Sequence, residues 1–252
     1  MPRYDFRKPR LYVDSPLGGG TSVGLDAAQA HYLRDVLRLK GGDGVLVFNG
    51  RDGEWRARIV EASKRKQLLE IEKQTRTQTS ALDLHYLFAP LRHARLDYLT
   101  QKAVEMGVSR LQPVMTRHGQ VRRVNAERMR ANAIEAAEQC GILTVPDIEP
   151  LRPLGDVIAA RDPGRVLVFC DEDAEVKDPI ATLSAARVAD RNAPMPIAVL
   201  VGPEGGFAAD ERAALMQLPN TVRLALGPRV LRADTAAVAA LALVGAVLGD
   251  WR

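Results

Sequence analysis

The chain has 252 residues, 46% hydrophobic and 26% charged, which is enough to bury a sizeable core in one large or two modest domains. This composition excludes an intrinsically disordered chain. The formal net charge is only +4, but residues 1–80 contain 15 basic and 10 acidic residues, whereas residues 81–252 contain 20 and 21. The basic first third fits either a surface that attracts a polyanion or an ordinary solvated face.

The cysteines, histidines and apolar segments argue against a disulfide-linked, metal-binding, secreted or membrane protein. Cys140 and Cys170 form no CxxC pair, and the four histidines lack metal-ligand spacing. We therefore expect buried thiols in a reducing compartment, the cytoplasm, and no metal site. The N-terminus lacks an apolar signal core. The most apolar stretch, 236–248, is shorter than the roughly 20 residues that span a bilayer, so it predicts a buried helix and no membrane partner.

The first 75 residues have the pattern of a small, mostly β unit. Residues 26–39 predict a helix with Ala30, Leu33 and Leu37 on one face. Asn49-Gly50 marks a turn. Strands are predicted at 45–48, 55–60 and 67–72. Residues 74–81 are polar without apolar periodicity and predict a domain boundary.

From residue 82 onwards, predicted strands and helices alternate. Asn125 is the expected N-cap of a helix that runs to Cys140, and Asp234 the expected N-cap of an almost wholly apolar helix that ends near Gly249. A further helix is predicted at 94–106, and strands at 82–89, 110–115, 166–170, 197–201 and 222–226. Short, continuously hydrophobic strands are typical of a parallel sheet covered on both faces, so we expect an α/β fold.

Two loops follow successive strands of this predicted sheet and are candidates for a binding site. Residues 201–207 (VGPEGGF) contain three glycines, which permit positive φ and close approach of a ligand, or simply form a tight turn. Residues 226–236 (LGPRVLRADTA) place Arg232 just before a helix. Ligands of α/β sheets bind at the carboxyl edge, where these loops meet. The signatures of P-loop, dinucleotide-binding, G-x-S-x-G and H-E-x-x-H proteins are absent from the sequence.

Together, the motifs of both halves closely resemble the 16S ribosomal RNA uridine N3-methyltransferases, type E of the small-subunit methyltransferases, within the SPOUT superfamily. In the first half the resemblance depends on His31, Val36-Leu37-Arg38, Gly42-Asp43 and Asn49-Gly50. In the second half it depends on Gln101-Lys102-Ala103-Val104-Glu105-Met106-Gly107, Glu138-Gln139-Cys140-Gly141, Gly202-Pro203-Glu204-Gly205-Gly206 and Leu226-Gly227-Pro228-Arg229-Val230-Leu231-Arg232.

One departure from the family pattern follows the last of these motifs. The family usually continues Arg-Thr-Glu-Thr, whereas this chain has Arg232-Ala233-Asp234-Thr235. Asp234 keeps the acidic group of the family's Glu on a shorter side chain, and Ala233 lacks the hydroxyl of the family's Thr. A side-chain role at position 233 is therefore in doubt, although the loop itself is not.

The resemblance implies an α/β fold in which residues 1–75 form a PUA-like RNA-binding β-barrel and residues 80–252 a SPOUT-type methyltransferase domain with a trefoil knot. It also implies a homodimer, the cofactor S-adenosylmethionine, and methylation at N3 of a uridine in the decoding region of 16S rRNA in the 30S subunit. The residues expected to bind the cofactor are Leu200, Val201, Gly202, Pro203, Gly205, Leu226, Gly227, Val230, Leu231 and Thr235.

Transfer to uracil N3 requires loss of the N3 proton and stabilisation of the uridine anion. We assign Arg232 to the negative charge on the uracil oxygens, whereas Glu204 is either the general base or a positioning group. The expected RNA contacts are His31, Arg34, Arg38, Lys64, Arg65 and Lys66, each of which could also be an ordinary surface residue. An RNA-binding module without catalysis, and a methyltransferase for another RNA such as transfer RNA, remain alternatives.

Overall fold

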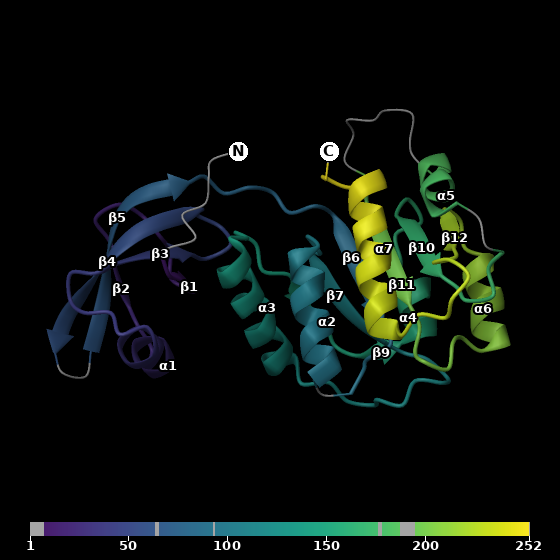
Figure 1. The fold of residues 1–252 in the computed structure, drawn as a ribbon, viewed down its shortest axis with the longest axis horizontal. Helices are drawn as coiled ribbons and strands as arrows, with labels where there is room; N and C mark the ends of the chain where they lie inside the picture. Colours follow the sequence, from purple (N-terminus) through teal and green to yellow (C-terminus); the bar gives the residue numbers. More distant parts are fainter. Residues whose placement is uncertain (1–7, 64–65, 93, 176–177, 187–194, 252) are drawn as a thin grey trace. The chain divides into compact units, whose positions relative to one another are not determined.

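The computed structural model describes residues 8–63, 66–92, 94–175, 178–186 and 195–251 (Figure 1). The chain divides into two compact units. The first comprises Met1–Ser80 together with Ala137–Val145, and the second comprises Ala81–Ala136 and Pro146–Arg252. A short internal segment therefore belongs with the N-terminal unit, although it is distant in sequence.

The first unit is built on a five-stranded sheet in the order β1-β3-β4-β5-β2. Its strands are β1 (Arg10–Tyr12), β2 (Ser22–Gly24), β3 (Gly44–Phe48), β4 (Glu54–Ser63) and β5 (Lys66–Arg76). β1 pairs with β3 in parallel, and the other pairs are antiparallel. Register shifts interrupt the β4–β5 pairing, and such bulges bend strands. Apolar side chains that alternate along the strands, such as Val45, Val47, Ile59 and Ile71, form its core.

The helix predicted at 26–39 is shorter than expected. Asp26 caps α1 (Ala27–His31) by accepting a 2.8 Å hydrogen bond from the backbone N–H of Gln29. A π-helical turn, η1 (Tyr32–Val36), follows. Arg38 then adopts φ 58°, in the left-handed region, and this conformation ends the helical path before Leu39.

The end of α3 (Ala126–Cys140) belongs to the first unit. Arg10 donates to the carbonyls of Ala137 and Glu138 at 2.6 and 3.1 Å and pairs with the buried Glu54 at 2.9 Å. Glu138 in turn accepts the backbone N–H of Tyr12 at 2.7 Å. These contacts satisfy carbonyls that a helix C-terminus leaves without intrahelical partners. The Glu138-Gln139-Cys140-Gly141 motif is thus part of the structural framework.

The second unit contains a parallel sheet in the order β12-β10-β11-β6-β7-β8, with β9 pairing with β7. The strands are β6 (Leu84–Phe88), β7 (Arg110–Met115), β8 (Asp147–Ile148), β9 (Arg152–Pro153), β10 (Val166–Cys170), β11 (Ile197–Val201) and β12 (Thr221–Leu224). The helices are α2 (Ala94–Glu105), α3, α4 (Leu154–Ala159), α5 (Pro179–Ala185), α6 (Ala209–Met216) and α7 (Ala233–Val247). The predicted α/β class is therefore confirmed.

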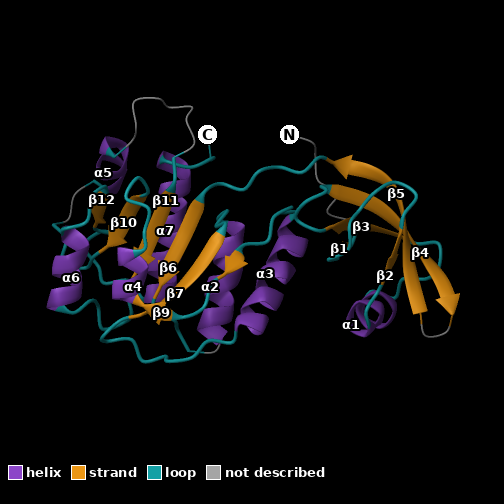
Figure 2. Cartoon of the chain, turned by 180° about the vertical axis from the view of Figure 1, so that it is seen from behind, coloured by secondary structure: helices purple, strands orange, loops and turns teal. Residues whose placement is uncertain are grey.

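Helices cover both faces of this sheet (Figure 2). Val166, Val168 and Cys170 of β10 pack in the same cluster as residues of α2, α3, α5 and α7. Leu167 and Phe169 of that strand pack on the opposite face with residues of α4 and α6. Because successive strand side chains alternate between faces, a strand buried on both faces must be hydrophobic throughout, as the sequence indicated.

The two predicted N-caps have different outcomes. The side chain of Asn125 accepts the backbone N–H of Arg128 at 3.0 Å, which confirms it as the cap of α3. The assignment of Asp234 is wrong, because α7 begins at Ala233 and its N-cap residue is Arg232, whose extended backbone precedes the helix. Asp234 lies in the first turn, where an acidic side chain complements the helix dipole.

Within the described ranges, no helix combines the length and apolar character needed to cross a bilayer.

Candidate active site

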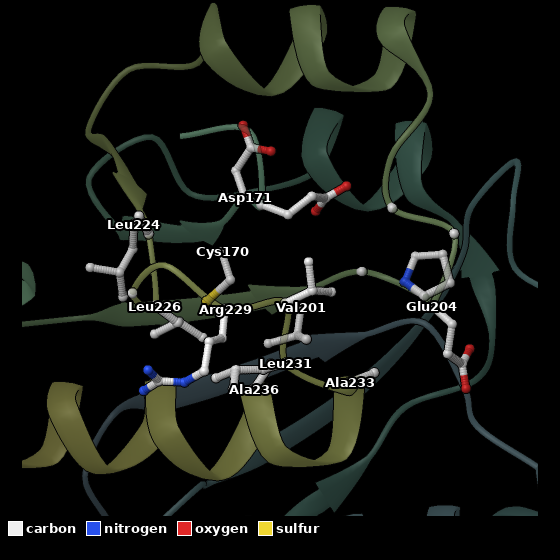
Figure 3. A pocket seen from close by; sticks show the side chains of 18 of the residues that line it. Cys170, Asp171, Val201, Glu204, Leu224, Leu226, Arg229, Leu231, Ala233 and Ala236 are labelled. Atoms are coloured by element: carbon white, nitrogen blue, oxygen red, sulfur yellow. The ribbon is translucent and has the colours of Figure 1, made fainter. Parts of the chain in front are cut away.

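A cavity of about 420 Å³ lies at the carboxyl ends of β10, β11 and β12, beside the start of α7 (Figure 3). Its volume is in the range of pockets that hold small molecules. The loop after β11 forms one side and the loop after β12 another. The lining residues are Cys170, Asp171, Glu172, Val201, Gly202, Pro203, Glu204, Gly205, Gly206, Leu224, Ala225, Leu226, Gly227, Pro228, Arg229, Val230, Leu231, Ala233 and Ala236.

The glycines after β11 make room for protein side chains. A Cβ on Gly202 would lie 2.6 Å from the ring of Phe207, which packs edge-on against Phe169 at 5.0 Å between centroids. Gly206 has φ +66°, and a Cβ there would overlap with the carboxylate of Glu172. The glycines are therefore needed to close the loop against its own neighbours, a requirement distinct from the ligand approach predicted from the sequence.

The loop after β12 is more open. Gly227 adopts φ +95°, and a Cβ there would have no atom within 4 Å. Val230 is 90% exposed although it lines the cavity, so a large apolar side chain is presented at its entrance. Arg229 lines the cavity from the same loop and is exposed (Figure 3). Leu226, Leu231 and Ala236 provide an apolar surface.

An acidic segment after β10 forms a third side of the cavity. The side chain of Asp171 is fully buried and accepts hydrogen bonds from Nε of Arg223 at 2.6 Å and Nε of Arg212 at 3.1 Å. Arg212 also pairs with Glu172 at 3.4 Å. Burial, with a smaller contribution from the charge of Asp171, raises the pKa of the Cys170 thiol to about 12. Cys170 therefore remains a neutral thiol and contributes apolar surface to the cavity.

Glu204 lies at the edge of the cavity with its carboxylate directed away from Cys170 and Leu226 (Figure 3). Its Oε1 is 3.5 Å from Nη1 of Arg95, and both side chains are about half exposed. The neighbouring Gly205 carbonyl lies 2.9 Å from Nδ1 of His118. Residues from the segments that follow β6 and β7 thus hold the outer side of this loop.

Of the ten residues predicted to bind a cofactor, eight line the cavity. The other two are Leu200, which is fully buried in β11, and Thr235, which is exposed on α7. Of the two predicted catalytic residues, Glu204 lines the cavity, whereas Arg232 is exposed at the start of α7 between the lining residues Leu231 and Ala233.

The side of the cavity formed by Cys170, Asp171 and Glu172 was not predicted from the sequence, and neither was the contribution of Ala236 from α7. A signal for the acidic segment was present, because Asp171 to Asp173 directly follow a buried strand at the carboxyl edge of the predicted sheet. Arg229 lies in the predicted loop 226–236, but the sequence alone predicts no role for its side chain.

The RNA-contact residues predicted in the first unit are exposed where they are described. His31 and Arg34 both contact Asp35, at 2.6 and 2.7 Å, and these partners lower the pKa of Asp35 to about 2. Asp35 therefore offsets part of the positive charge of Arg34. Arg38 is exposed. Lys64 and Arg65 lie outside the described residues, and Lys66 is placed only as the first residue of β5.

A parallel sheet with a ligand-sized cavity between two loops at its carboxyl edge defines an α/β protein that binds a small molecule at that edge. Residues 78–245 match the family described as the RNA methyltransferase domain, and residues 25–72 match the RNA methyltransferase PUA domain. The chain belongs to this RNA methyltransferase family, and the match includes both cavity loops.

Relatives of similar length give the same assignment. The ribosomal RNA small subunit methyltransferase E of Rickettsia conorii is 32% identical over 236 residues, which cover 93% of this chain and 94% of the relative. A crystal structure of the Neisseria gonorrhoeae protein of that name, bound to S-adenosyl methionine, is 27% identical, with a TM-score of 0.82 and coverage of 97% of this chain and 100% of that one. A Legionella pneumophila methyltransferase in complex with the same cofactor is 25% identical, with a TM-score of 0.79 and coverage of 95% and 98%.

Proposed function

We propose that this chain transfers a methyl group from S-adenosylmethionine to N3 of a uridine in the decoding region of 16S rRNA. The observation that carries the proposal is the cavity, which is formed by two loops of the matched RNA methyltransferase domain. The similar Neisseria gonorrhoeae structure, which is bound to S-adenosyl methionine, supports the choice of cofactor.

The residues of the cavity suit a nucleoside joined to a charged amino-acid chain. Leu226, Leu231 and Ala236 offer an apolar surface for a base, and backbone groups of the two loops offer donors and acceptors. Glu172 supplies a carboxylate for hydroxyl groups or an amine. When bound, the cofactor supplies an electrophilic methyl group on a sulfonium.

The protein's own groups would position uracil and stabilise its anion. Arg232 lies beside the cavity and carries a fixed positive charge, which stabilises negative charge on the uracil oxygens and lowers the N3 pKa. Glu204 is engaged by Arg95, so its position favours a positioning role over that of general base. The Arg95–Glu204 pair would then hold the loop after β11 in place while substrate binds.

We further propose the larger organisation that the family resemblance implies. Residues 1–75 form the RNA-binding domain and residues 80–252 a trefoil-knotted methyltransferase domain, and the enzyme works in the cytoplasm as a homodimer on the 30S subunit. His31, Arg34, Arg38, Lys64, Arg65 and Lys66 would contact RNA from the first domain. Within the described part of the chain, no group of three or more metal-ligating side chains occurs, and the proposed reaction requires none.

Filling the cavity tests the cofactor site. Ala236 lines it from α7, so Ala236→Leu should occupy space that the cofactor needs and weaken S-adenosylmethionine binding more than 10-fold in calorimetry, or about 1.4 kcal/mol. Ala213→Leu, at an exposed position of α6, is the matched control. Wild-type affinity in a folded Ala236→Leu protein would contradict this placement. Gly205→Val is a weaker test, because a Cβ at this position would lie 3.2 Å from His118. A loss of affinity would then also reflect displacement of the loop.

The target base is tested by nucleoside mass spectrometry of 16S rRNA from a deletion strain, with and without complementation. We expect N3-methyluridine to be lost and then restored by the wild-type gene. A modified nucleoside that disappears from transfer RNA instead would identify the alternative substrate. Cofactor binding without any methylated product would favour the non-catalytic RNA-binding module.

A further inference from the structure

The second unit has little net charge overall, yet its charge is sharply segregated along the chain. Residues 91–130 contain nine Lys and Arg against three Asp and Glu, a net of +6. Residues 131–252 contain 11 basic and 17 acidic residues, a net of −6. The near-neutral total of residues 81–252 therefore conceals a strongly basic segment, which includes α2, β7 and the start of α3.

Part of this segment borders the cavity. β6, β7 and β11 are neighbouring parallel strands, so the segments after them emerge at one edge of the sheet. Arg95, after β6, contacts Glu204 at 3.5 Å, and His118, after β7, lies 2.9 Å from the Gly205 carbonyl. Arg92 donates a 2.7 Å hydrogen bond to Gln120 and so connects the segments after β6 and β7. The segment after β6 and the segment after β7 therefore both contact the cavity loop 202–206.

The arginines of this region differ in how far they are neutralised. Arg117 pairs with Asp210 at 2.5 Å, and Arg128 with Asp97 at 2.6 Å. Arg122 and Arg123 are exposed, and no carboxylate among the described residues lies within ion-pair distance of either. Arg92 is exposed with a neutral amide as its partner. Arg92, in the segment after β6, and Arg122 and Arg123, in the segment after β7, thus present guanidinium groups that pair with no carboxylate among the described residues.

We propose that Arg92, Arg122 and Arg123 form a phosphate-binding surface on the methyltransferase unit itself, which holds the RNA backbone beside the cavity. The proposal rests on the proposed function and deepens it, because it adds a second RNA contact to the one expected from the first unit. Guanidinium groups bind phosphate oxygens with charge-assisted, often bidentate hydrogen bonds. Phosphates held at these arginines would position a base of the same RNA strand near the cavity. The number of phosphate contacts would determine how steeply RNA affinity falls with salt concentration.

The test measures RNA binding by the full-length chain to a 16S rRNA fragment at several salt concentrations. The variants are Arg122→Gln and Arg123→Gln, singly and together. Each lost phosphate contact should reduce the slope of log affinity against log salt by about 0.7–0.9. The KM for RNA should rise, whereas kcat and the affinity for S-adenosylmethionine should stay at wild-type values. Arg122→Lys should retain most of the slope, because it keeps the charge.

Arg110→Gln is the control, since this half-exposed arginine lies at the amino end of β7, the opposite edge of the sheet. It should leave the slope unchanged. A wild-type slope in the double variant overturns the proposal, as does a loss of cofactor affinity as large as the loss of RNA affinity. A wild-type protein that binds RNA but methylates no nucleoside would refute the proposed function, while the slopes would still decide whether this surface binds phosphate.

Discussion

His85 illustrates how one partly buried side chain can make stability depend on pH. Its Nε2 lies 3.3 Å from Asp83, and its side chain is 18% exposed. Burial, together with the positive charges of Arg165 and Arg110, lowers its pKa to about 4 against the opposing effect of Asp83 and Asp147. The folded protein therefore keeps the imidazole neutral at pH values where an unfolded chain would protonate it.

The consequence is a loss of stability on acidification. Between about pH 6.5 and pH 4 the unfolded state binds a proton that the folded state does not, so the free energy of unfolding should fall as pH falls through this window. The expected contribution is about 2 kcal/mol after allowance for solvent screening. Urea denaturation at several pH values should show a steeper decline for the wild type than for His85→Gln. Parallel curves would contradict this assignment.

At the cavity, the sequence predicted the two loops but not all of the side chains that meet there. The loops were detectable because the glycines and prolines of 202–206 and 227–228 interrupt the apolar runs of the preceding predicted strands. The contact of Glu172 with Gly206 was not detectable, although the acidic segment itself follows a predicted strand, because this contact depends on the pairing of β10 with β11, which are separated by a helix in the sequence. Side-chain contacts between distant segments have no local signal.

Among the elements, α3 depends on tertiary contacts at its C-terminus. No basic residue lies in its last turn, and Arg10 from β1 contacts its terminal carbonyls instead. Arg10 is held by Glu54 and lies 4.6 Å from the centre of the Phe48 ring. This buried ion pair thus connects the sheet of the first unit to the segment Ala137–Val145.

Removing Arg10 should therefore be costly. Arg10→Met would remove the side-chain donor to the Ala137 and Glu138 carbonyls, of which Ala137 keeps the backbone N–H of Ile142 at 3.1 Å. It would also leave Glu54 with only Arg76, at 3.4 Å, as an ion-pair partner among the described residues. Loss of one partner of a buried pair costs about 3–5 kcal/mol. Arg56→Met removes an exposed arginine paired with Glu72, and should cost less than about 1 kcal/mol. Equal midpoints for the two variants in urea denaturation would show that the buried network contributes little.

Elements with a strong repeating pattern were predicted accurately. The bounds of β7, β10 and β11 are as expected. β10 and β11 are continuous apolar runs, which mark strands buried on both faces, whereas β7 also contains Arg110 and Gln112. In contrast, α4, α5 and α6, which have six, seven and eight residues, were not predicted from the sequence. Such short helices contain too few turns for a clear apolar stripe, and tertiary packing determines their conformation.

At the scale of the whole molecule, the outward face of α7 is the surface on which we base a prediction about assembly. The helix packs against α2 and α5, and Leu241, Val244 and Leu248 are buried in the core. Its opposite side is less exposed than the sequence suggested, since Ala239 and Leu243 are half-buried and not fully exposed. Ala246 is exposed. This face therefore consists largely of small apolar side chains, which allow two helices to approach closely.

We predict that this face lies at or near a two-fold dimer interface, because an isologous contact buries the same small apolar surface on both subunits. Ala239→Glu would place two charges close together in that contact and should shift the protein to a monomer in light scattering, with methylation reduced in parallel. Leu243→Glu should act in the same direction, with some added loss of stability because Leu243 also packs on the core. Ala159→Glu, at an exposed position of α4 on the opposite face of the sheet, is the matched control and should remain dimeric. A fully active wild-type monomer at assay concentration would refute both the interface and the dependence of catalysis on the dimer.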